Sequence, residues 1–140
     1  MVAYSFQARF APLIREGLKL QTIRGHRARH ARPGERVQLF TGLRTKQASR
    51  IVADPVCITV SNCEITFASA RISRVVVAGL PVRDLDMFAA LDGFEDLGDM
   101  TAFWLERHGA KAFSGVLIEW AHPRSAIETL PWLSREAGAA

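Results

Sequence analysis

One segment organises the predicted fold, and it reads Gly17-Leu18-Lys19-Leu20-Gln21-Thr22-Ile23-Arg24. Gly17 ends a predicted short helix, and the loosely alternating residues after it indicate an extended segment. From Lys19 to Arg50 the chain contains nine lysine or arginine residues, half of its 18, and a single acid, Glu35. A solvated surface works equally well with mixed charge, so this bias indicates an anionic partner.

The composition of the whole chain is that of one globular domain. Its 140 residues are 49% hydrophobic and 23% charged, which argues against disorder, and its net charge is +4. A chain of this length buries roughly two-thirds of its surface on folding. It has no run of 18 apolar residues, and residues 1–9 do not resemble a signal peptide. We therefore expect a cytoplasmic protein without a membrane partner.

The cysteines and histidines do not form a recognisable metal motif. Cys57 and Cys63 are too few for a disulfide framework, and their even separation places them on one side of a continuous strand. We expect buried, reduced thiols, with a metal site shared with a distant histidine as the alternative. His26 and His30 would suit a metal if they were helical, but the flanking glycine and proline favour a loop. We therefore predict no metal and no other cofactor.

Hydrophobic patterning predicts more strands than helices. Strands are expected at residues 2–6, 36–40, 51–52, 56–60, 63–67, 72–77 and 113–120. Turns are expected near Asp54-Pro55, Ser61-Asn62 and Ser69-Ala70. Helices are expected at residues 10–16, 84–91 and 99–108, the last capped by Asp96 or Asp99, stopped by Gly109 and carrying His108 as a C-terminal cation. This pattern predicts an α+β fold, a small β-barrel of mixed or antiparallel strands decorated by two or three short helices.

Two groups of residues, in the right order, resemble a known family. The first is Gly17-x-Lys19-x-x-Thr22-Ile23-Arg24 followed by Arg32-Pro33-Gly34-Glu35. The second is Ala89-x-x-Asp92-Gly93-Phe94, then Asp99-Met100, then Phe113-x-Gly115 in a strand ending at Trp120. Together they resemble the ASCH domain, over roughly residues 2–120. The resemblance implies a PUA-like barrel in a domain of residues 1–120, and it leaves open whether a tail at residues 121–140 packs on that barrel.

The resemblance also implies a range of functions. ASCH members are regarded as RNA-binding or nucleoside-handling modules. One branch hydrolyses the acetyl amide of N4-acetylcytidine with a lysine, a threonine and a glutamate, and another member acts as a ribonuclease. Carried to this chain, the lysine corresponds to Lys19 and the threonine to Thr22. The acid corresponds to Asp92, which is one methylene shorter than glutamate, with Glu95 as the nearby alternative.

These three residue types can perform amide hydrolysis under particular conditions. A threonine hydroxyl needs a base, and a lysine acts as one only when burial or nearby cations lower its pKa. Arg24 would supply such a field around Lys19, and Asp92 would assist the leaving amine. Residues i and i+3 of a straight strand face opposite sides, so the mechanism requires a bend between Lys19 and Thr22.

Each of these residues also has a simpler interpretation. Lys19 would then be a solvated surface residue, and Thr22 a strand residue or a hydrogen-bond donor to a base or phosphate. Arg24 would form a structural salt bridge with Asp92 or Glu95. Asp92 itself would bond its own backbone in the Asp-Gly turn.

The basic loops suit phosphate contacts better than catalysis. The expected nucleic-acid-binding residues are Arg24, Arg27, Arg29, Arg32, Arg44 and Lys46. Phe40 is either a base-stacking surface or a core residue. Our first hypothesis is a domain that binds RNA or a modified nucleoside, and the alternative is an enzyme on the same cleft, an N4-acetylcytidine amidohydrolase or a ribonuclease. A module that binds an acidic protein has only charge to support it, and the oligomeric state stays open.

Overall fold

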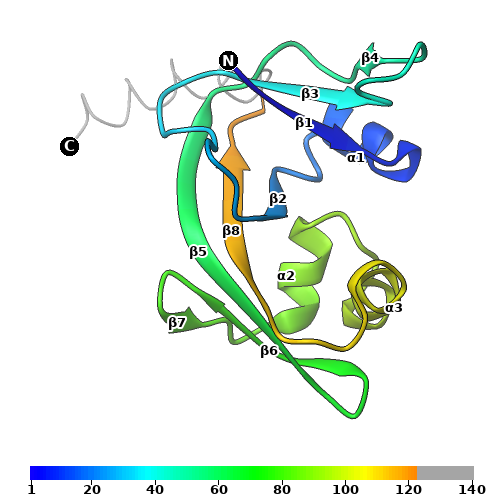
Figure 1. Ribbon diagram of the computed structural model, residues 1–140, viewed down its shortest axis with the longest axis vertical. Coiled ribbons are helices and arrows are strands. Elements are labelled where there is room, and N and C mark those ends of the chain that lie inside the picture. The colour runs from blue at the N-terminus through cyan, green and yellow to red at the C-terminus, as the bar shows by residue number, and fades with distance from the viewer. Residues whose placement is uncertain (123–140) are drawn as a thin grey trace, which may run out of the picture.

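The larger of two sheets is built on the long strand β5 (Cys57–Ala68). It pairs with β8 (Phe113–Trp120) on one side and with β6 (Arg71–Val77) on the other (Figure 1). Beyond β8 lies β2 (Gln21–Gly25), and beyond β6 lies the short β7 (Leu80–Pro81). All neighbours in this sheet are antiparallel. The computed structural model describes residues 1–122 of the chain.

The smaller sheet contains three strands, and its centre is β3 (Val37–Thr41). β1 (Val2–Phe6) is parallel to β3, and β4 (Ser49–Arg50) is antiparallel to it. An isolated bridge between Arg36 and Val56 joins the two sheets. The expected α+β class is therefore confirmed.

The two sheets do not close into the expected barrel within residues 1–122, because β1 and β2 do not pair. In place of backbone pairing between β1 and β2, the side chain of Arg24 connects the two strands. The terminal nitrogen Nη2 of Arg24 on β2 donates a hydrogen bond of 2.7 Å to the carbonyl of Ser5 on β1. An arginine with several donors can occupy this position and still present a nitrogen to a ligand.

One turn prediction and one strand prediction were wrong. Residues Ser61 and Asn62 do not turn, because they continue β5 and pair with Leu117 and Val116 on β8. Pairing with β8, together with a hydrogen bond from the Ala78 amide to the Asn62 carbonyl, satisfies the backbone here, so sheet pairing outweighs the local turn preference of serine and asparagine. The strand expected at 51–52 lies two residues earlier, as β4. Ile51 follows that strand and is a buried core residue.

Three α-helices and one 3-10 helix complete the fold of residues 1–122. The 3-10 helix η1 (Ala8–Phe10) leads into α1 (Ala11–Arg15), and α2 (Leu85–Leu91) and α3 (Leu97–His108) follow β7. The Asp84 carboxylate caps α2 through the amide of Met87, and that of Asp96 caps α3 through the amide of Asp99. α3 ends before Gly109, as predicted. None of the helices in residues 1–122 is long and apolar enough to cross a membrane.

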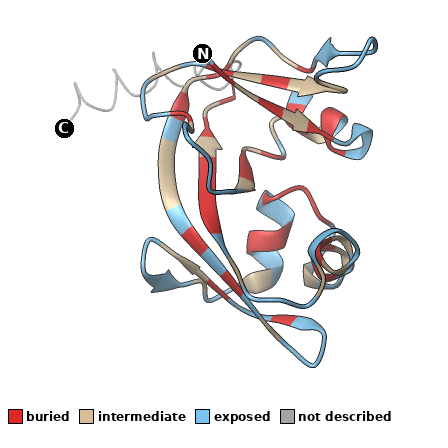
Figure 2. Cartoon of the chain, viewed as in Figure 1, coloured by how far each residue is buried: buried red, intermediate tan, exposed pale blue. Residues whose placement is uncertain are grey.

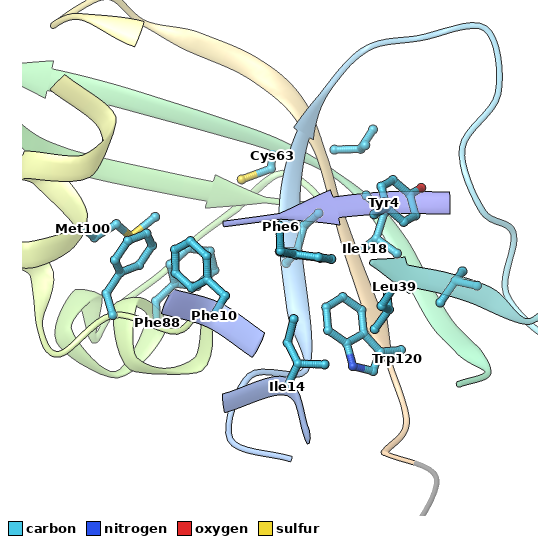
Figure 3. Packing of buried hydrophobic residues seen from close by; sticks show 14 of the residues in the cluster. Tyr4, Phe6, Phe10, Ile14, Leu39, Cys63, Phe88, Met100, Ile118 and Trp120 are labelled. Carbon is cyan, nitrogen blue, oxygen red and sulfur yellow. The ribbon is translucent and has the colours of Figure 1, made fainter. Parts of the chain in front are cut away.

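The core joins both sheets to the helices. Buried positions are concentrated along β8 and at the start of β2 (Figure 2). Phe6 of β1 lies between two groups of buried side chains, one beside the helices and one between the sheets: Phe10, Phe88 and Met100, and Leu39, Ile118 and Trp120 (Figure 3).

The two cysteines belong to this core. Cys57 and Cys63 are buried and unbonded to each other, as predicted, and burial raises the pKa of the Cys63 thiol to about 12. The expected tail lies outside the described residues, apart from Ala121 and His122.

Candidate functional site

A pocket of about 210 Å³ opens between β1, β2, the end of α2 and α3. Its wall contains six aromatic side chains: Phe6, Phe10, Phe94, Phe103, Trp104 and Phe113. Its polar and charged side chains include Lys19, Thr22, Arg24, Asp92, Arg107 and His108. The structure thus brings together the three predicted catalytic residues and Arg24. The other predicted binding residues are not part of this wall: Arg27, Arg29, Arg32, Arg44 and Lys46.

A bend before β2 brings Lys19 and Thr22 to the same pocket. The backbone amides of Leu18 and Lys19 both donate to the carbonyl of Leu13, which ends α1 and turns the chain. β2 begins only at Gln21, so Lys19 precedes the strand and does not follow its alternation. The bend that the hydrolytic mechanism requires is therefore present. Within residues 1–122, no hydrogen bond joins the side chains of Lys19 and Thr22.

Lys19 is a buried residue and not the solvated one of the simpler interpretation. Only 3% of its surface is exposed. Its Nζ donates a hydrogen bond of 2.5 Å to the carbonyl of Asp92 and lies 3.6 Å from the Oδ1 of the same residue. The ammonium also lies 5.0 Å from the ring centre of Phe10 and 5.6 Å from that of Phe6. Two aromatic faces and one carboxyl group thus replace the water around this lysine.

Burial shifts the pKa values of both members of this pair. Burial lowers the pKa of Lys19, the attraction of Asp92 opposes this shift, and the nearby Arg24 adds to it. Burial raises the pKa of Asp92, and Lys19 opposes that shift. Desolvation disfavours the charged form of each group, so burial brings the two pKa values toward each other and makes proton transfer in this pair easier. A neutral amine can accept a proton, and a carboxylic acid can donate one.

Asp92 owes its position to the end of α2 and to a glycine. Asp92 is the C-cap of α2, and its Oδ1 accepts a hydrogen bond of 3.3 Å from Nε2 of Gln21. Gly93 follows with a φ of 96°, and a Cβ there would lie 2.8 Å from Cδ of Lys19. No side chain fits this position without displacing the lysine, which explains the Asp-Gly sequence.

Glu95, the alternative acid, lies outside this wall. It lines a second cavity between α1 and α2, on the other side of Gly93. The acid beside Lys19 is therefore Asp92.

Thr22 and Arg24 form a second polar pair on β2. Nε of Arg24 donates a hydrogen bond of 3.0 Å to Oγ1 of Thr22. The guanidinium lies 4.7 Å from the ring centre of Phe6 and 5.3 Å from that of Tyr4, and burial lowers the pKa of Arg24 to about 10. Arg24 forms no salt bridge with a described acid. Its donation to Thr22 leaves the hydroxyl proton free for another acceptor and would stabilise negative charge on Oγ1.

The basic loops differ from the pocket because they face solvent. Arg27 lies over the ring of Tyr4 at 4.6 Å and donates to the carbonyl of Arg29. Arg29 forms an ion pair of 2.9 Å with Glu35. Arg32, Arg44 and Lys46 are exposed.

The remaining candidates of these loops have structural contacts. His30 contacts the hydroxyl of Tyr4 at 2.9 Å, and Arg50 lies 5.5 Å from the ring centre of the half-buried Phe40. Residues 1–122 contain no group of three or more histidine, cysteine, aspartate or glutamate residues that could hold a metal.

Three polar residues in or beside the site were not identified from the sequence. Gln21 lies inside the motif, and it supports the site from behind the pocket wall, because it is buried and donates to Asp92. Arg107 lies four residues after Phe103, and His108 lies four residues after Trp104. Each therefore shares a helix face with an aromatic residue of the pocket wall. This spacing could have identified them.

Comparison of the chain with known protein families, with curated protein sequences and with solved structures finds no match. The contacts described above therefore define the site.

Proposed function

We propose that this chain is a PUA-like domain of the ASCH type that binds RNA or a modified nucleoside and holds a nucleobase in the pocket. One observation carries the proposal: a small pocket combines aromatic walls with the buried polar groups of Lys19 and Thr22 and the half-buried guanidinium of Arg24. A nucleobase has an aromatic face that stacks on such walls and an edge that bonds such groups. The order of the sequence motifs supports the family assignment.

The size of the pocket favours a single base. A volume of about 210 Å³ suits one small ring system and is too small for a strand of several nucleotides. RNA is commonly recognised through single bases that leave the stack and enter such pockets. The exposed cations of residues 26–50 would then contact the phosphates of neighbouring nucleotides.

Calorimetric titration with ribonucleosides tests this proposal. The panel is adenosine, guanosine, cytidine, uridine and N4-acetylcytidine. At least one nucleoside is expected to bind, and Thr22→Val, which removes only the hydroxyl, is expected to weaken its binding several-fold. Arg74→Gln removes an exposed cation outside the pocket and is the matched control. The proposal is wrong if no nucleoside binds, or if both variants bind like the parent protein.

A second candidate function is hydrolysis of the acetyl amide of N4-acetylcytidine. The observation that favours it is the lowered pKa of Lys19 in the same pocket as Thr22. In this mechanism, the Lys19 amine takes the hydroxyl proton as Oγ1 of Thr22 attacks the acetyl carbonyl. Asp92, whose pKa is raised, gives a proton to the cytosine nitrogen as the C–N bond breaks. Water then hydrolyses the acetyl-threonine ester, which releases acetic acid and restores the hydroxyl, and the proton on Lys19 passes to Asp92 to restore both groups.

Chromatography of N4-acetylcytidine incubated with the protein tests this mechanism. Lys19→Ala and Thr22→Ala are expected to abolish cytidine release. Thr22→Ser keeps a hydroxyl and should retain part of the activity, and Arg27→Ala lies outside the pocket and should retain nearly all of it. Turnover that survives in Lys19→Ala would exclude the lysine as the base. Absence of turnover in the parent protein would leave nucleoside binding as the function.

A further inference from the structure

The pocket contains positive charge that its own acid does not neutralise. Asp92 is the single carboxylate of the described wall, and it is already paired with Lys19. Moving the proton between these two groups leaves their combined charge at zero. The surplus therefore comes from Arg24 and Arg107, whose guanidinium groups remain charged at neutral pH.

These two arginines come from different elements of the pocket wall. Arg24 lies on β2, and Arg107 lies in the last turn of α3. In residues 1–122 no carboxylate pairs with either side chain. Arg107 is exposed and lies 5.5 Å from the ring centre of Phe103, a residue of the pocket wall. One arginine is thus half-buried in the pocket, and the other lies at its mouth.

Each guanidinium retains unused hydrogen-bond donors. Arg24 uses Nε for Thr22 and Nη2 for Ser5, so its other terminal nitrogen has no partner among the described residues. Arg107 donates no hydrogen bond within residues 1–122 and interacts there through its position over Phe103. The two charges also affect each other, because burial and then the neighbouring cations Arg27 and Arg107 lower the pKa of Arg24. An anion between them would relieve this repulsion and accept the free donors.

A structural role for Arg107 accounts for only half of this arrangement. A cation in the last turn of a helix stabilises the helix dipole, and Arg107 has that position in α3. The dipole does not explain why Arg24, on another element, faces the same pocket without an acid. Both observations follow if an anionic group of the ligand lies between the two arginines.

We propose that Arg24 and Arg107 form a phosphate subsite at the mouth of the pocket, so that the ligand is a nucleoside carrying a phosphate ester. This inference rests on the proposed binding of a nucleobase in the same pocket. The phosphate belongs either to a free mononucleotide or to an RNA chain, and both sources present the same chemistry to a guanidinium. The subsite is separate from the loop cations of residues 26–50, none of which lines the pocket.

Calorimetry with matched ligands tests the subsite. Adenosine, guanosine, cytidine and uridine are each compared with their 5′-monophosphates on the parent protein, on Arg107→Gln and on Arg74→Gln. A monophosphate is expected to bind about tenfold more tightly than its nucleoside, as for one charge-assisted contact. Arg107→Gln should reduce this ratio several-fold, because Arg24 alone then contacts the phosphate, whereas Arg74→Gln, an exposed cation outside the pocket, should keep it. Thermal melts of both variants establish that they fold.

The outcomes separate this inference from the proposed function. Equal affinity for nucleosides and monophosphates would overturn the phosphate subsite and leave nucleobase binding intact. A monophosphate preference that is undiminished in Arg107→Gln would also overturn it. Failure of every nucleoside and monophosphate to bind would overturn both proposals. The dinucleotides ApA and CpC distinguish the source: an Arg107-dependent gain with these diesters indicates an RNA chain, and a gain confined to monoesters indicates a mononucleotide or an RNA end.

Discussion

The pocket and the basic loops both carry cations, but the cations of the loops are exposed to water, whereas Lys19 in the pocket is buried and Arg24 is half-buried. The exposed pair of Arg29 and Glu35 is closer, at 2.9 Å, than the buried pair of Lys19 and Asp92, at 3.6 Å. The closer pair is screened by water, and such pairs contribute little to stability. The buried pair has lost its hydration, so each member depends on the other. Burial, and not the number or proximity of charges, therefore distinguishes the region suited to chemistry from the region suited to phosphate contacts.

The largest effect is expected from breaking the buried pair. Either Lys19→Met or Asp92→Ala should lower the free energy of unfolding by about 3–5 kcal/mol, because each leaves an uncompensated buried charge. The double variant should lose much less than the sum of these two, because both charges are gone. Urea unfolding of the four proteins measures this coupling.

The exposed pair provides the control for this cycle. The corresponding variants Arg29→Ala and Glu35→Ala should each cost under about 1 kcal/mol and show little coupling. Equal coupling energies in the two cycles would contradict the distinction between the two regions.

The next effect concerns the glycine that makes room for Lys19. Gly93→Ala should destabilise the protein by about 2–4 kcal/mol, because its Cβ adds a close contact to the strain of a positive φ. Gly79 also has a positive φ, of 80°, but its Cβ would meet nothing within 4 Å. Gly79→Ala should therefore cost only about 1–2 kcal/mol. Thermal unfolding compares the two variants, and equal costs would show that the contact with Lys19 is unimportant.

The strands were more predictable than the site. Patterning predicted β1 at 2–6 and β8 at 113–120 with the observed bounds, because β1 alternates between buried and half-buried positions and the middle of β8 is a continuous buried run. It failed at Ser61-Asn62, where pairing of β5 with β8 outweighs local turn preference. Local pattern cannot report which strands surround a segment.

The site was predicted in part. The motif indicated Lys19, Thr22, Arg24 and Asp92, and all four line the pocket. The hydrolytic mechanism required a bend in the chain before Thr22, and the structure has one. The pocket wall, however, is assembled from β1, β2, α3 and the segment after α2, which only the folded chain brings together. Arg107 was missed because a cation at a helix end already has a structural explanation.

A smaller effect is expected in the pH dependence of stability. In Asp92→Asn the carboxylate that raises the pKa of Lys19 is gone, so the pKa of this lysine falls further in the folded state. A folded-state pKa below the unfolded value means that stability rises as pH increases from the folded value toward about 10.4. The gain cannot exceed about 1.4 kcal/mol per pH unit for one group. Urea unfolding between neutral and alkaline pH measures this gain.

The matched control for this pH profile lacks the titrating group. The double variant of Lys19→Met and Asp92→Asn should not show the rise, because no buried amine remains. Parallel profiles for the two proteins would contradict the assignment of the effect to Lys19.

The smallest effects are expected in the loops. Replacing Arg27, Arg32 or Arg44 with alanine should weaken binding of a short single-stranded RNA only a few-fold. Each removed phosphate contact should reduce the slope of log affinity against log salt by about 0.7. Nucleoside binding should not change, since these side chains lie outside the pocket. A loop variant that weakens nucleoside and RNA binding equally would contradict the division between pocket and loops.

The most direct test of this division is a nuclear magnetic resonance titration of ¹⁵N-labelled protein with the ribonucleoside panel. It requires no substitution, so folding of a variant does not affect the result. We predict that amide shifts change at Lys19, Thr22, Arg24, Asp92 and Phe94, with little change in residues 42–48. Shifts confined to the basic loops, or absent throughout, would contradict the claim that the buried pocket holds the base.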